Sequence, residues 1–283
     1  MIDQTADEIA DMQTHSSSVV AVKAARALRE LTDREFPVVE EYLRALERNS
    51  NALRRANPSH ASLHNTQGRI VERVTGEDHD SVAAAQRRTE TAIDAVVETV
   101  EAGKRRAAAN GADLLADDDT LLVHDYSTTV LSAVTRAVED GASFTVYVTE
   151  ARPRYLGRKM ARRLADFEAV DTHLLVDSAG GHYLPECDRV VVGMDCIVED
   201  TLYNRVGTYP LAATAADAGV PVAVVGSAAK LVDAGFAFQN EFRAASEVMR
   251  EPADGFAVDN PAYDATPTRL VDTVVTDEGR FDP

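Results

Sequence analysis

The chain has 283 residues, which is enough for one large or two modest domains with a hydrophobic core. Its formal net charge of −18 argues against non-specific binding to nucleic acid, which requires basic patches. Among its 29 Lys and Arg residues only four are lysine. This composition favours a halophilic protein, because high salt screens self-repulsion, and the alternative is an ordinary acidic protein.

The sequence also argues against a membrane-spanning protein and against a disulfide-stabilised protein. No run of about 18 apolar residues occurs, so we expect no transmembrane helix. The acidic start, MIDQTADEIADM, lacks an apolar signal region, which predicts a cytoplasmic protein. Cys187 and Cys196 are too few for a disulfide framework, and we expect both to be reduced, small apolar residues in or near the core.

Residues 1–115 are predicted to form a helical N-terminal domain without strands. Over residues 9–31, apolar side chains that include Met12 recur at helical spacing. A long helix is predicted over residues 82–109, and Asn110-Gly111 is expected to end it. We interpret the apolar stripes of this half as core packing.

Local signals divide the first half into shorter helices. Thr32 and Glu35 have the spacing of a capping box, which predicts a helix over residues 36–46. Asn49-Ser50 and Asn57-Pro58-Ser59 are predicted breaks. The first half therefore reads as several helices joined by short turns.

Two histidines are candidate metal ligands. His60 and His64 lie four residues apart, a spacing that can bind zinc on one helix face. No cysteine or acidic partner lies near them at a standard ligand spacing. We therefore expect neither a metal site nor a cofactor.

Residues 116–283 are predicted to form an α/β domain with a mainly parallel sheet, because short strands and helices alternate there. The predicted strands cover residues 120–124, 143–148, 172–176, 190–192 and 222–225, and the predicted helices cover 130–138, 157–165 and 211–218. Residues 261–267 read as a turn-rich segment, and residues 268–275 as a last short strand or helix.

The stretch from Arg189 to Lys230 is the unit on which we place the site. It reads as strand, polar loop, helix and strand, with Thr208 as the helix N-cap. Ligands of parallel sheets bind beyond the carboxyl ends of the strands, and a helix N-terminus favours anions. We therefore predict a small phosphorylated ligand at this edge. The expected ligand-binding residues of this unit are Asn204, Arg205, Gly207 and Lys230.

Two further strand ends are expected at the same edge. The first carries His124, Asp125, Ser127 and Thr128, whose hydroxyls either cap the next helix or hold a phosphate. The second carries Arg154, which suits an anionic ligand, although a solvated charge run is the alternative. These residues complete the predicted ligand-binding set.

Asp195 is the predicted acid–base residue. It follows an apolar strand, where a carboxylate can transfer protons or bind sugar hydroxyls, and a simple turn residue is the alternative. Its neighbour Cys196 is expected to point the other way, because strand side chains alternate. Lys230 is of interest because the chain has few lysines, and a surface lysine is the alternative.

Taken together, these motifs resemble those of a known family. The similarity rests on residues 192–195, 204–208, 219–221 and Lys230, and also on residues 124–129, 148–153 and 263–267. The chain resembles the alpha, beta and delta regulatory subunits of initiation factor 2B, the exchange factor for translation initiation factor 2. The same family includes methylthioribose-1-phosphate isomerase and ribose-1,5-bisphosphate isomerase, the latter of archaeal type.

The resemblance implies a helical N-terminal domain, a Rossmann-like domain and homo-oligomers that form through the second domain. It also implies that the isomerases use a cysteine at the position of Asp125 and an aspartate at that of Asp195. An aspartate cannot replace a thiol as a soft nucleophile. The Arg-Gly-Ala motif of the isomerases is missing from residues 17–23, and their Asn-Lys pair is Asn204-Arg205 here.

These departures lead us to expect a non-catalytic, initiation factor 2B-like regulatory subunit that binds a sugar phosphate or nucleotide monophosphate. Its implied partners are initiation factor 2 or paralogous subunits, with no DNA and no membrane. The alternative is an aldose–ketose isomerase of a ribose 1-phosphate derivative, in which Asp195 is catalytic.

Overall fold

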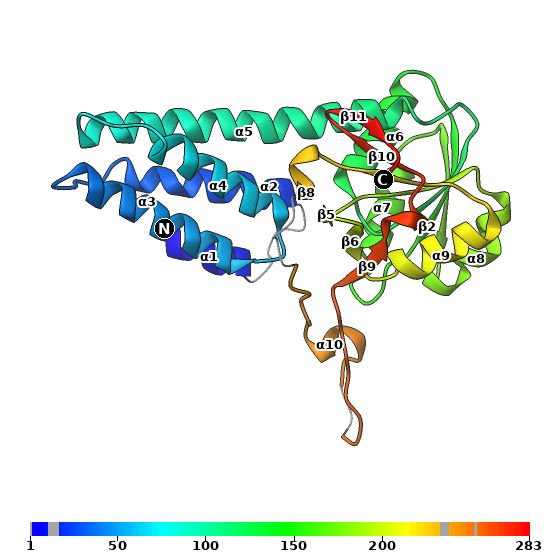
Figure 1. Ribbon diagram of the computed structural model, residues 1–283. Helices are drawn as coiled ribbons and strands as arrows, with labels where there is room; N and C mark the ends of the chain where they lie inside the picture. Colours follow the sequence, from blue (N-terminus) through cyan, green and yellow to red (C-terminus); the bar gives the residue numbers. More distant parts are fainter. Residues whose placement is uncertain (1, 11–16, 233–237, 252–253) are drawn as a thin grey trace. The chain divides into compact units, whose positions relative to one another are not determined.

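The computed structural model describes residues 2–10, 17–232, 238–251 and 254–283 (Figure 1). Met12, part of the predicted helical stripe, lies outside these residues. The chain divides into two compact units, Met1–Gly103 and Lys104–Pro283. Helix α5 (Val82–Ala112) continues from the first unit into the second, and our domain boundary after residue 115 stays a prediction.

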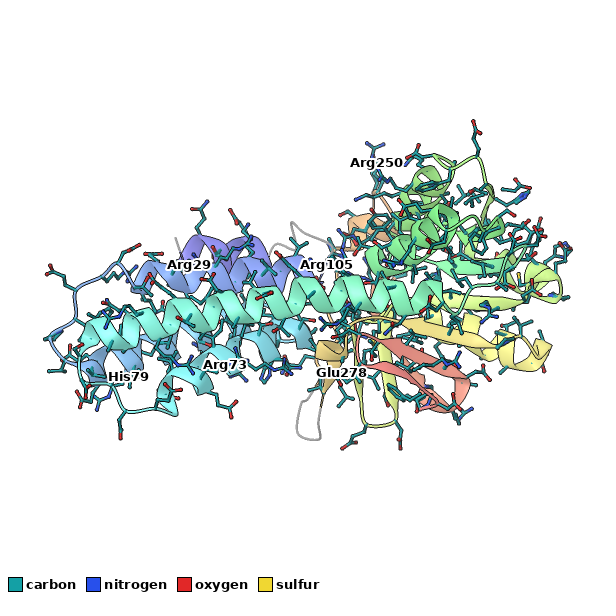
Figure 2. The ribbon with its side chains drawn as sticks, turned by 90° about the horizontal axis from the view of Figure 1, so that it is seen from above. Arg29, Arg73, His79, Arg105, Arg250 and Glu278 are labelled. Atoms are coloured by element: carbon teal, nitrogen blue, oxygen red, sulfur yellow. The ribbon has the colours of Figure 1, made fainter. Side chains whose placement is uncertain are left out.

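The described part of the first unit consists of helices joined by turns and loops, without strands. Its elements are α1 (Ile2–Ala10), α2 (Ser17–Ala27), the 3-10 turn η1 (Leu28–Leu31), α3 (Val39–Ala56), α4 (Ala61–Thr75) and the first part of α5. Their apolar faces form one core around Tyr42, Leu53 and Leu63, while Arg29 and Arg73, labelled in Figure 2, are exposed. No described helix combines the length and the apolar character needed to cross a membrane.

The capping-box prediction in this unit is wrong. Thr32 follows the 3-10 turn η1, and its hydroxyl donates to the carbonyl oxygen of Arg29. Helix α3 begins only at Val39, after Pro37. The residue before a proline is pushed out of the helical region, so the helix cannot start at residue 36.

Asn49-Ser50 does not end a helix, because it lies inside α3, whereas α5 ends at Ala112, directly after the predicted stop Asn110-Gly111. The Asn49 side chain donates to the carbonyl of Ala45 inside α3, whereas the predicted break at Asn57 does end that helix. In α5, a side chain at Gly111 would come within 2.8 Å of a Val225 methyl group. Gly111 therefore also allows close packing at the last turn of α5.

The second unit is built on a seven-stranded sheet in the order β11-β10-β7-β4-β1-β2-β3 (Figure 1). All its pairings are parallel except that of β10 with β11. The strands are β1 (Thr120–His124), β2 (Phe144–Thr149), β3 (Val170–Leu175), β4 (Arg189–Val192), β7 (Val222–Val225), β10 (Thr273–Thr276) and β11 (Gly279–Phe281). The predicted α/β class with a mainly parallel sheet is confirmed.

Helices cover both faces of this sheet, so that strand alternation creates two cores. One core places Leu122 and Val190 against α8 (Gly180–Tyr183) and α9 (Thr208–Ala218). The other places Leu121 and Val191 against α6 (Thr128–Glu139) and α7 (Leu156–Leu164). Such a doubly wound sheet leaves the carboxyl ends of its strands open to a ligand.

A second, four-stranded sheet in the order β8-β5-β6-β9 has no counterpart in the sequence-based prediction. Its strands are β5 (Cys196–Val198), β6 (Thr201–Arg205), β8 (Leu231–Val232) and β9 (Tyr263–Pro267). The predicted polar loop after β4 is therefore largely a β-hairpin, and part of the predicted turn segment 261–267 is a strand. The short helix α10 (Ala245–Val248) precedes β9.

Candidate functional site

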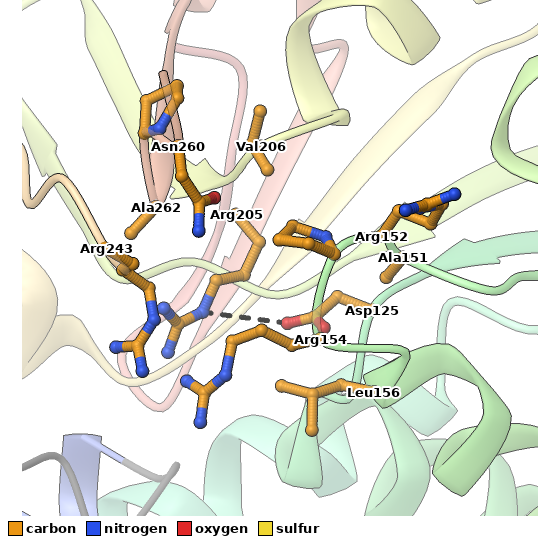
Figure 3. Close-up of a pocket in the computed structure, with 12 residues that line it drawn as sticks. Asp125, Ala151, Arg152, Arg154, Leu156, Arg205, Val206, Arg243, Asn260 and Ala262 are labelled. Carbon is orange, nitrogen blue, oxygen red and sulfur yellow. Dashed lines mark ion pairs between the residues drawn. The ribbon is translucent and has the colours of Figure 1, made fainter. Parts of the chain in front are cut away.

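Two carboxylates and one guanidinium define the centre of the site. Asp125 follows β1 and Asp195 follows β4, two strands that are parallel neighbours in the sheet. Arg205, the last residue of β6, places its Nε 3.7 Å from Asp125 Oδ2 and 3.9 Å from Asp195 Oδ2. Figure 3 shows the first of these ion pairs. The arrangement joins two acids through one cation.

The centre lies mostly out of contact with water, since the side chains of Asp125, Asp195 and Arg205 are each only 11–13% exposed. Burial raises the pKa of Asp125, and the nearby charge of Asp195 adds to this, while Arg205 and His124 oppose it. Burial alone would lower the pKa of Arg205, but the charges of Asp195, Tyr263 and Asp125 outweigh it and raise that pKa. Asp125 is therefore biased towards its protonated form.

The backbone of Asp125 has an unusual conformation. Its φ of 64° lies in the left-handed region, which aspartate tolerates better than most residues with a side chain. The preceding His124 is only 4% exposed and fixes the loop at this point. Its Nε2 donates to the carbonyl of Val206 (2.9 Å), because a carbonyl only accepts, and its Nδ1 then accepts from the hydroxyl of Thr149 (2.7 Å).

His124 therefore uses both ring nitrogens within the protein. Its predicted contact with a ligand stays a prediction, and what the structure shows is a role in positioning Asp125. The same applies to Ser127, whose hydroxyl accepts from the backbone N–H of Val130 (3.3 Å) and caps α6. Thr128 is the first residue of that helix, and its contact with a ligand also stays a prediction.

The start of α9 differs from the expected anion site. Its N-cap is Gly207 and not Thr208. The carboxylate of Asp264 accepts from the backbone N–H groups of Gly207 (2.8 Å) and Tyr209 (2.9 Å). The chain thus places its own anion at this helix N-terminus, and a ligand at Gly207 stays a prediction.

Asn204 does not face the carboxylates. It precedes Arg205 in β6, and successive strand side chains point to opposite faces. Its amide donates to the hydroxyl of Thr208 (3.0 Å), which in turn donates to the carbonyl of Arg205 (2.7 Å). We interpret this chain of hydrogen bonds as support for the turn between β6 and α9.

Lys230 lies near Asp195 and is partly buried. Its Nζ donates to the carbonyl of Met194 (2.6 Å), which leaves two of its three N–H donors for other partners. Burial lowers its pKa, and the charges of Asp195 and Cys196 counteract this. Cys196 is fully buried, and burial raises its pKa to about 12, so it cannot act as the thiolate of the site.

A pocket opens beside Asp125 and Arg205. It is lined by Asp125, Ala151, Arg152, Pro153, Arg154, Leu156, Arg205, Val206, Arg243, Asn260, Pro261 and Ala262 (Figure 3). Burial lowers the pKa of Arg154, and the charges of Arg243 and Arg205 lower it further. Three guanidinium groups gather here, and Glu247 already pairs with two of them, Arg154 (3.9 Å) and Arg243 (2.9 Å), so that a bound anion would compete with this carboxylate.

Three residues of this region are missed or undervalued by the sequence patterns. Arg243 gives no signal, because it lies in an irregular segment far along the chain from the strand ends. Tyr263 and Asp264 belong to the matched segment 263–267, which is the available signal. Among the described residues, no group of three His, Cys, Asp or Glu side chains could hold a metal ion.

The fold and the site together define a doubly wound α/β protein with an arginine-rich pocket beside two acids at the carboxyl edge of its sheet. The sequence model of the Initiation factor 2 subunit family matches residues 13–283. The chain therefore belongs to this family.

Ribose 1,5-bisphosphate isomerase of Haloterrigena turkmenica is 33% identical over 99% of this chain and 89% of its own length. Methylthioribose-1-phosphate isomerase of Pelotomaculum thermopropionicum is 30% identical over 93% of this chain and 76% of its own length. The crystal structure of translation initiation factor eIF-2B from Pyrococcus horikoshii has a TM-score of 0.83 at 24% identity, covering 100% of this chain and 97% of that chain, and supports the fold.

These relatives correct our functional expectation. Six archaeal relatives, 28–33% identical over nearly the whole chain, are named ribose 1,5-bisphosphate isomerase. The expected non-catalytic regulatory subunit is therefore wrong, and the enzymatic alternative is favoured. The error comes from giving Asp125 and Ser127, a few residues at one strand end, more weight than similarity along the full chain.

Proposed function

We propose that this protein is an aldose–ketose isomerase that converts ribose 1,5-bisphosphate to the corresponding ketose. The observation that carries the proposal is the pair Asp125 and Asp195, held on either side of Arg205 at the ends of adjacent strands. Isomerisation needs one group that donates a proton and one that removes it, and two carboxyls in different environments suit these roles.

The proposed steps use each carboxyl in turn. Protonated Asp125 gives its proton to the ring oxygen, and the bond from that oxygen to C1 breaks. Asp195 removes the hydrogen of C2 as a proton, and the electron pair forms the C1–C2 double bond of an enol phosphate. The same proton then returns to C1, and the C2 hydroxyl gives its proton back to Asp125. No atom or electron is gained or lost, as isomerisation requires.

The raised pKa of Asp125 supports this assignment, because a general acid must hold its proton before the reaction. It also supports a reaction without the family cysteine, since a carboxylic acid can donate a proton although it is a poor nucleophile. Arg205 positions both carboxyls and provides positive charge near the oxygen that changes from hydroxyl to carbonyl.

The lining of the pocket supports a bisphosphate as substrate. Arg154 and Arg243 have side chains that are 20% and 14% exposed, and both point towards the region of Arg205 (Figure 3). Guanidinium groups suit phosphate oxygens. Lys230 offers a second cationic contact near Asp195. The proposed ligand contacts of Asp125, Arg154, Arg205 and Lys230 are part of this proposal.

The test is phosphorus NMR of ribose 1,5-bisphosphate with the purified protein in molar potassium chloride, since salt adaptation stays part of our prediction. We expect conversion to the ketose by the wild type. Asp195→Asn and Asp125→Asn should each slow it by about 100-fold or more. The control is Asp166→Asn, which changes an exposed aspartate on the surface. Binding of the substrate by the wild type without conversion would overturn the proposal.

A second experiment compares two substrates, ribose 1,5-bisphosphate and methylthioribose 1-phosphate. Arg154→Gln should lower kcat/KM for ribose 1,5-bisphosphate by about 10- to 100-fold, the value of one charged hydrogen bond to phosphate. Methylthioribose 1-phosphate should not be converted by the wild type at a comparable rate. Equal rates for both sugars would show that the arginines do not select a second phosphate.

Oligomer formation and cytoplasmic location belong to the same proposal. Leu174 in the outer strand β3 and Val176 just after this strand are 49% and 57% exposed, and a second copy would cover them. Light scattering would measure the mass of the protein in solution.

The proposed cytoplasmic location agrees with the cysteines. Both cysteines are unpaired, as in a reducing compartment.

A further inference from the structure

Tyr263 lies directly opposite Arg205 in the small sheet. The two residues form a register pair of the antiparallel strands β6 and β9, so their side chains share one face. The guanidinium carbon of Arg205 lies 4.7 Å from the centroid of the Tyr263 ring. This is the face on which Arg205 meets Asp125 and Asp195, so that Tyr263 belongs to the surroundings of the two acids.

The ring of Tyr263 is fixed on several sides. Phe238 packs edge-on against it, with ring centroids 5.3 Å apart. The backbone of Tyr263 is held by Asn240, which donates to its carbonyl (2.7 Å) and accepts from its N–H (3.2 Å). The position of the phenol is therefore set before any ligand arrives.

The hydroxyl of Tyr263 is buried, and no partner for it exists among the described residues. The residue as a whole is 2% exposed. A buried hydroxyl without a partner destabilises a fold, because its lost hydrogen bonds to water are not replaced, so proteins rarely keep one without a use. Phenylalanine would fill the same space without this penalty.

We propose that the Tyr263 hydroxyl donates a hydrogen bond to a sugar oxygen of the bound sugar phosphate, beside Arg205 and Asp195. This inference rests on the proposed site but not on turnover. Burial and the charge of Asp195 raise the pKa of Tyr263, so the phenol keeps its proton and serves as a donor and not as a base. Tyr263 would thus favour ligands that carry an oxygen at this point.

The test compares Tyr263→Phe with the wild type in two measurements. Calorimetric titration with ribulose 1,5-bisphosphate should give a Kd for the variant that is about fivefold higher or more, the effect of one lost hydrogen bond. Urea unfolding without ligand should give an equal or higher midpoint for the variant. The control is Tyr203→Phe, whose ring stacks on Phe238 at 3.9 Å and which should leave the Kd unchanged.

The outcomes separate this inference from the proposed function. If the wild type converts substrate and the Kd of Tyr263→Phe equals that of the wild type, the role of Tyr263 is overturned and the proposed isomerase is not. A lower unfolding midpoint of Tyr263→Phe would show a structural partner for the hydroxyl and also overturn it. Ligand binding that depends on Tyr263, without turnover by the wild type, would support Tyr263 and overturn the isomerase. Absence of binding by the wild type would overturn both.

Discussion

Gly207 leaves the space that the imidazole of His124 occupies. A Cβ atom at residue 207 would lie 2.5 Å from Cε1 and 2.7 Å from Nε2 of His124. The φ of Gly207 is also 107°, a conformation that residues with side chains rarely adopt. The turn after β6 and the strand end that carries Asp125 are therefore fitted to each other through this glycine.

We predict that Gly207→Ala lowers the free energy of unfolding by about 2–4 kcal/mol, from backbone strain and from the collision with His124. Gly141→Ala is a matched control, because Gly141 has a similar φ of 104°, and a Cβ atom there would meet nothing within 4 Å among the described residues. Gly141→Ala should lower the free energy of unfolding by about 1–2 kcal/mol, from backbone strain alone. Urea unfolding measures both, and equal losses would show that the contact with His124 has no effect.

The carboxylate of Asp264 should stabilise the start of α9. It accepts two backbone N–H groups, those of Gly207 and Tyr209, at a helix N-terminus. We expect Asp264→Ala to lower the free energy of unfolding by about 1–2 kcal/mol. Asp217→Ala should have no such effect, because Asp217 is exposed near the other end of the same helix. An equal loss in both variants would contradict the capping role.

The large sheet can be predicted because its strands carry local signals. The predicted strands at 120–124 and 222–225 coincide with β1 and β7, whose buried valines and leucines form short apolar runs bounded by polar residues or glycine. The parallel pairing of β4 with β7 also follows from the predicted strand, helix and strand order.

The small sheet cannot be predicted from such runs. Its strands β5 and β6 are short, and β6 carries the polar residues Asn204 and Arg205 that suggest a loop. Its last strand, β9, ends in Pro267 and reads as a turn. These strands are stabilised by pairing with segments far along the chain, which a local pattern does not reveal.

The candidate site is predictable only in part for the same reason. Asp125 and Asp195 are found from strand ends that share one edge, and Arg205 is found from the polar sequence that follows Asp195. Arg243 comes from a segment without regular structure, so that only tertiary packing brings it to the pocket. The hydrogen bond of Gly207 to Asp264 joins residues 57 positions apart and is equally hidden.

The buried carboxyl of Asp125 should make stability depend on pH. Its pKa is raised mainly by burial, so the folded state binds this proton more tightly than the unfolded state. The contribution of Asp125 to stability therefore falls as pH rises from the unfolded pKa, about 3.9, through the folded pKa, and stays low above it. Asp125→Asn should accordingly be more stable than the wild type above about pH 4, by a margin that grows as pH rises through the folded pKa. Urea unfolding at several pH values measures this difference.

Asp117→Asn should show the opposite dependence of stability on pH. Hydrogen bonds from the backbone and side chain of Ser143 lower the pKa of Asp117. Its contribution is present above the unfolded pKa and is lost as pH falls through the folded pKa. Asp117→Asn should therefore be less stable than the wild type at neutral pH, with a difference that shrinks in acid. The same pH trend in both variants would show that burial does not control Asp125.

The last prediction concerns acid sensitivity within the helical unit. Burial and the adjacent charge of Arg54 lower the pKa of His64. The unfolded chain, with a histidine pKa of about 6.5, then binds a proton more readily than the folded chain. The stability that His64 contributes is present above this pKa and falls as pH drops from the unfolded towards the folded value. We therefore expect His64→Gln to lose less stability than the wild type between about pH 7.5 and pH 5.5.

Urea unfolding at the two pH values measures this difference, with His173→Gln as the control, since His173 has a side chain that is 46% exposed on the outer strand β3. His173→Gln should follow the wild type. If His64→Gln and the wild type lose equal stability in acid, the buried contact with Arg54 does not hold His64 in its uncharged form. The acid response of the helical unit must then come from carboxylates such as Glu30, whose pKa is lowered by hydrogen bonds from Arg34 and Ile2.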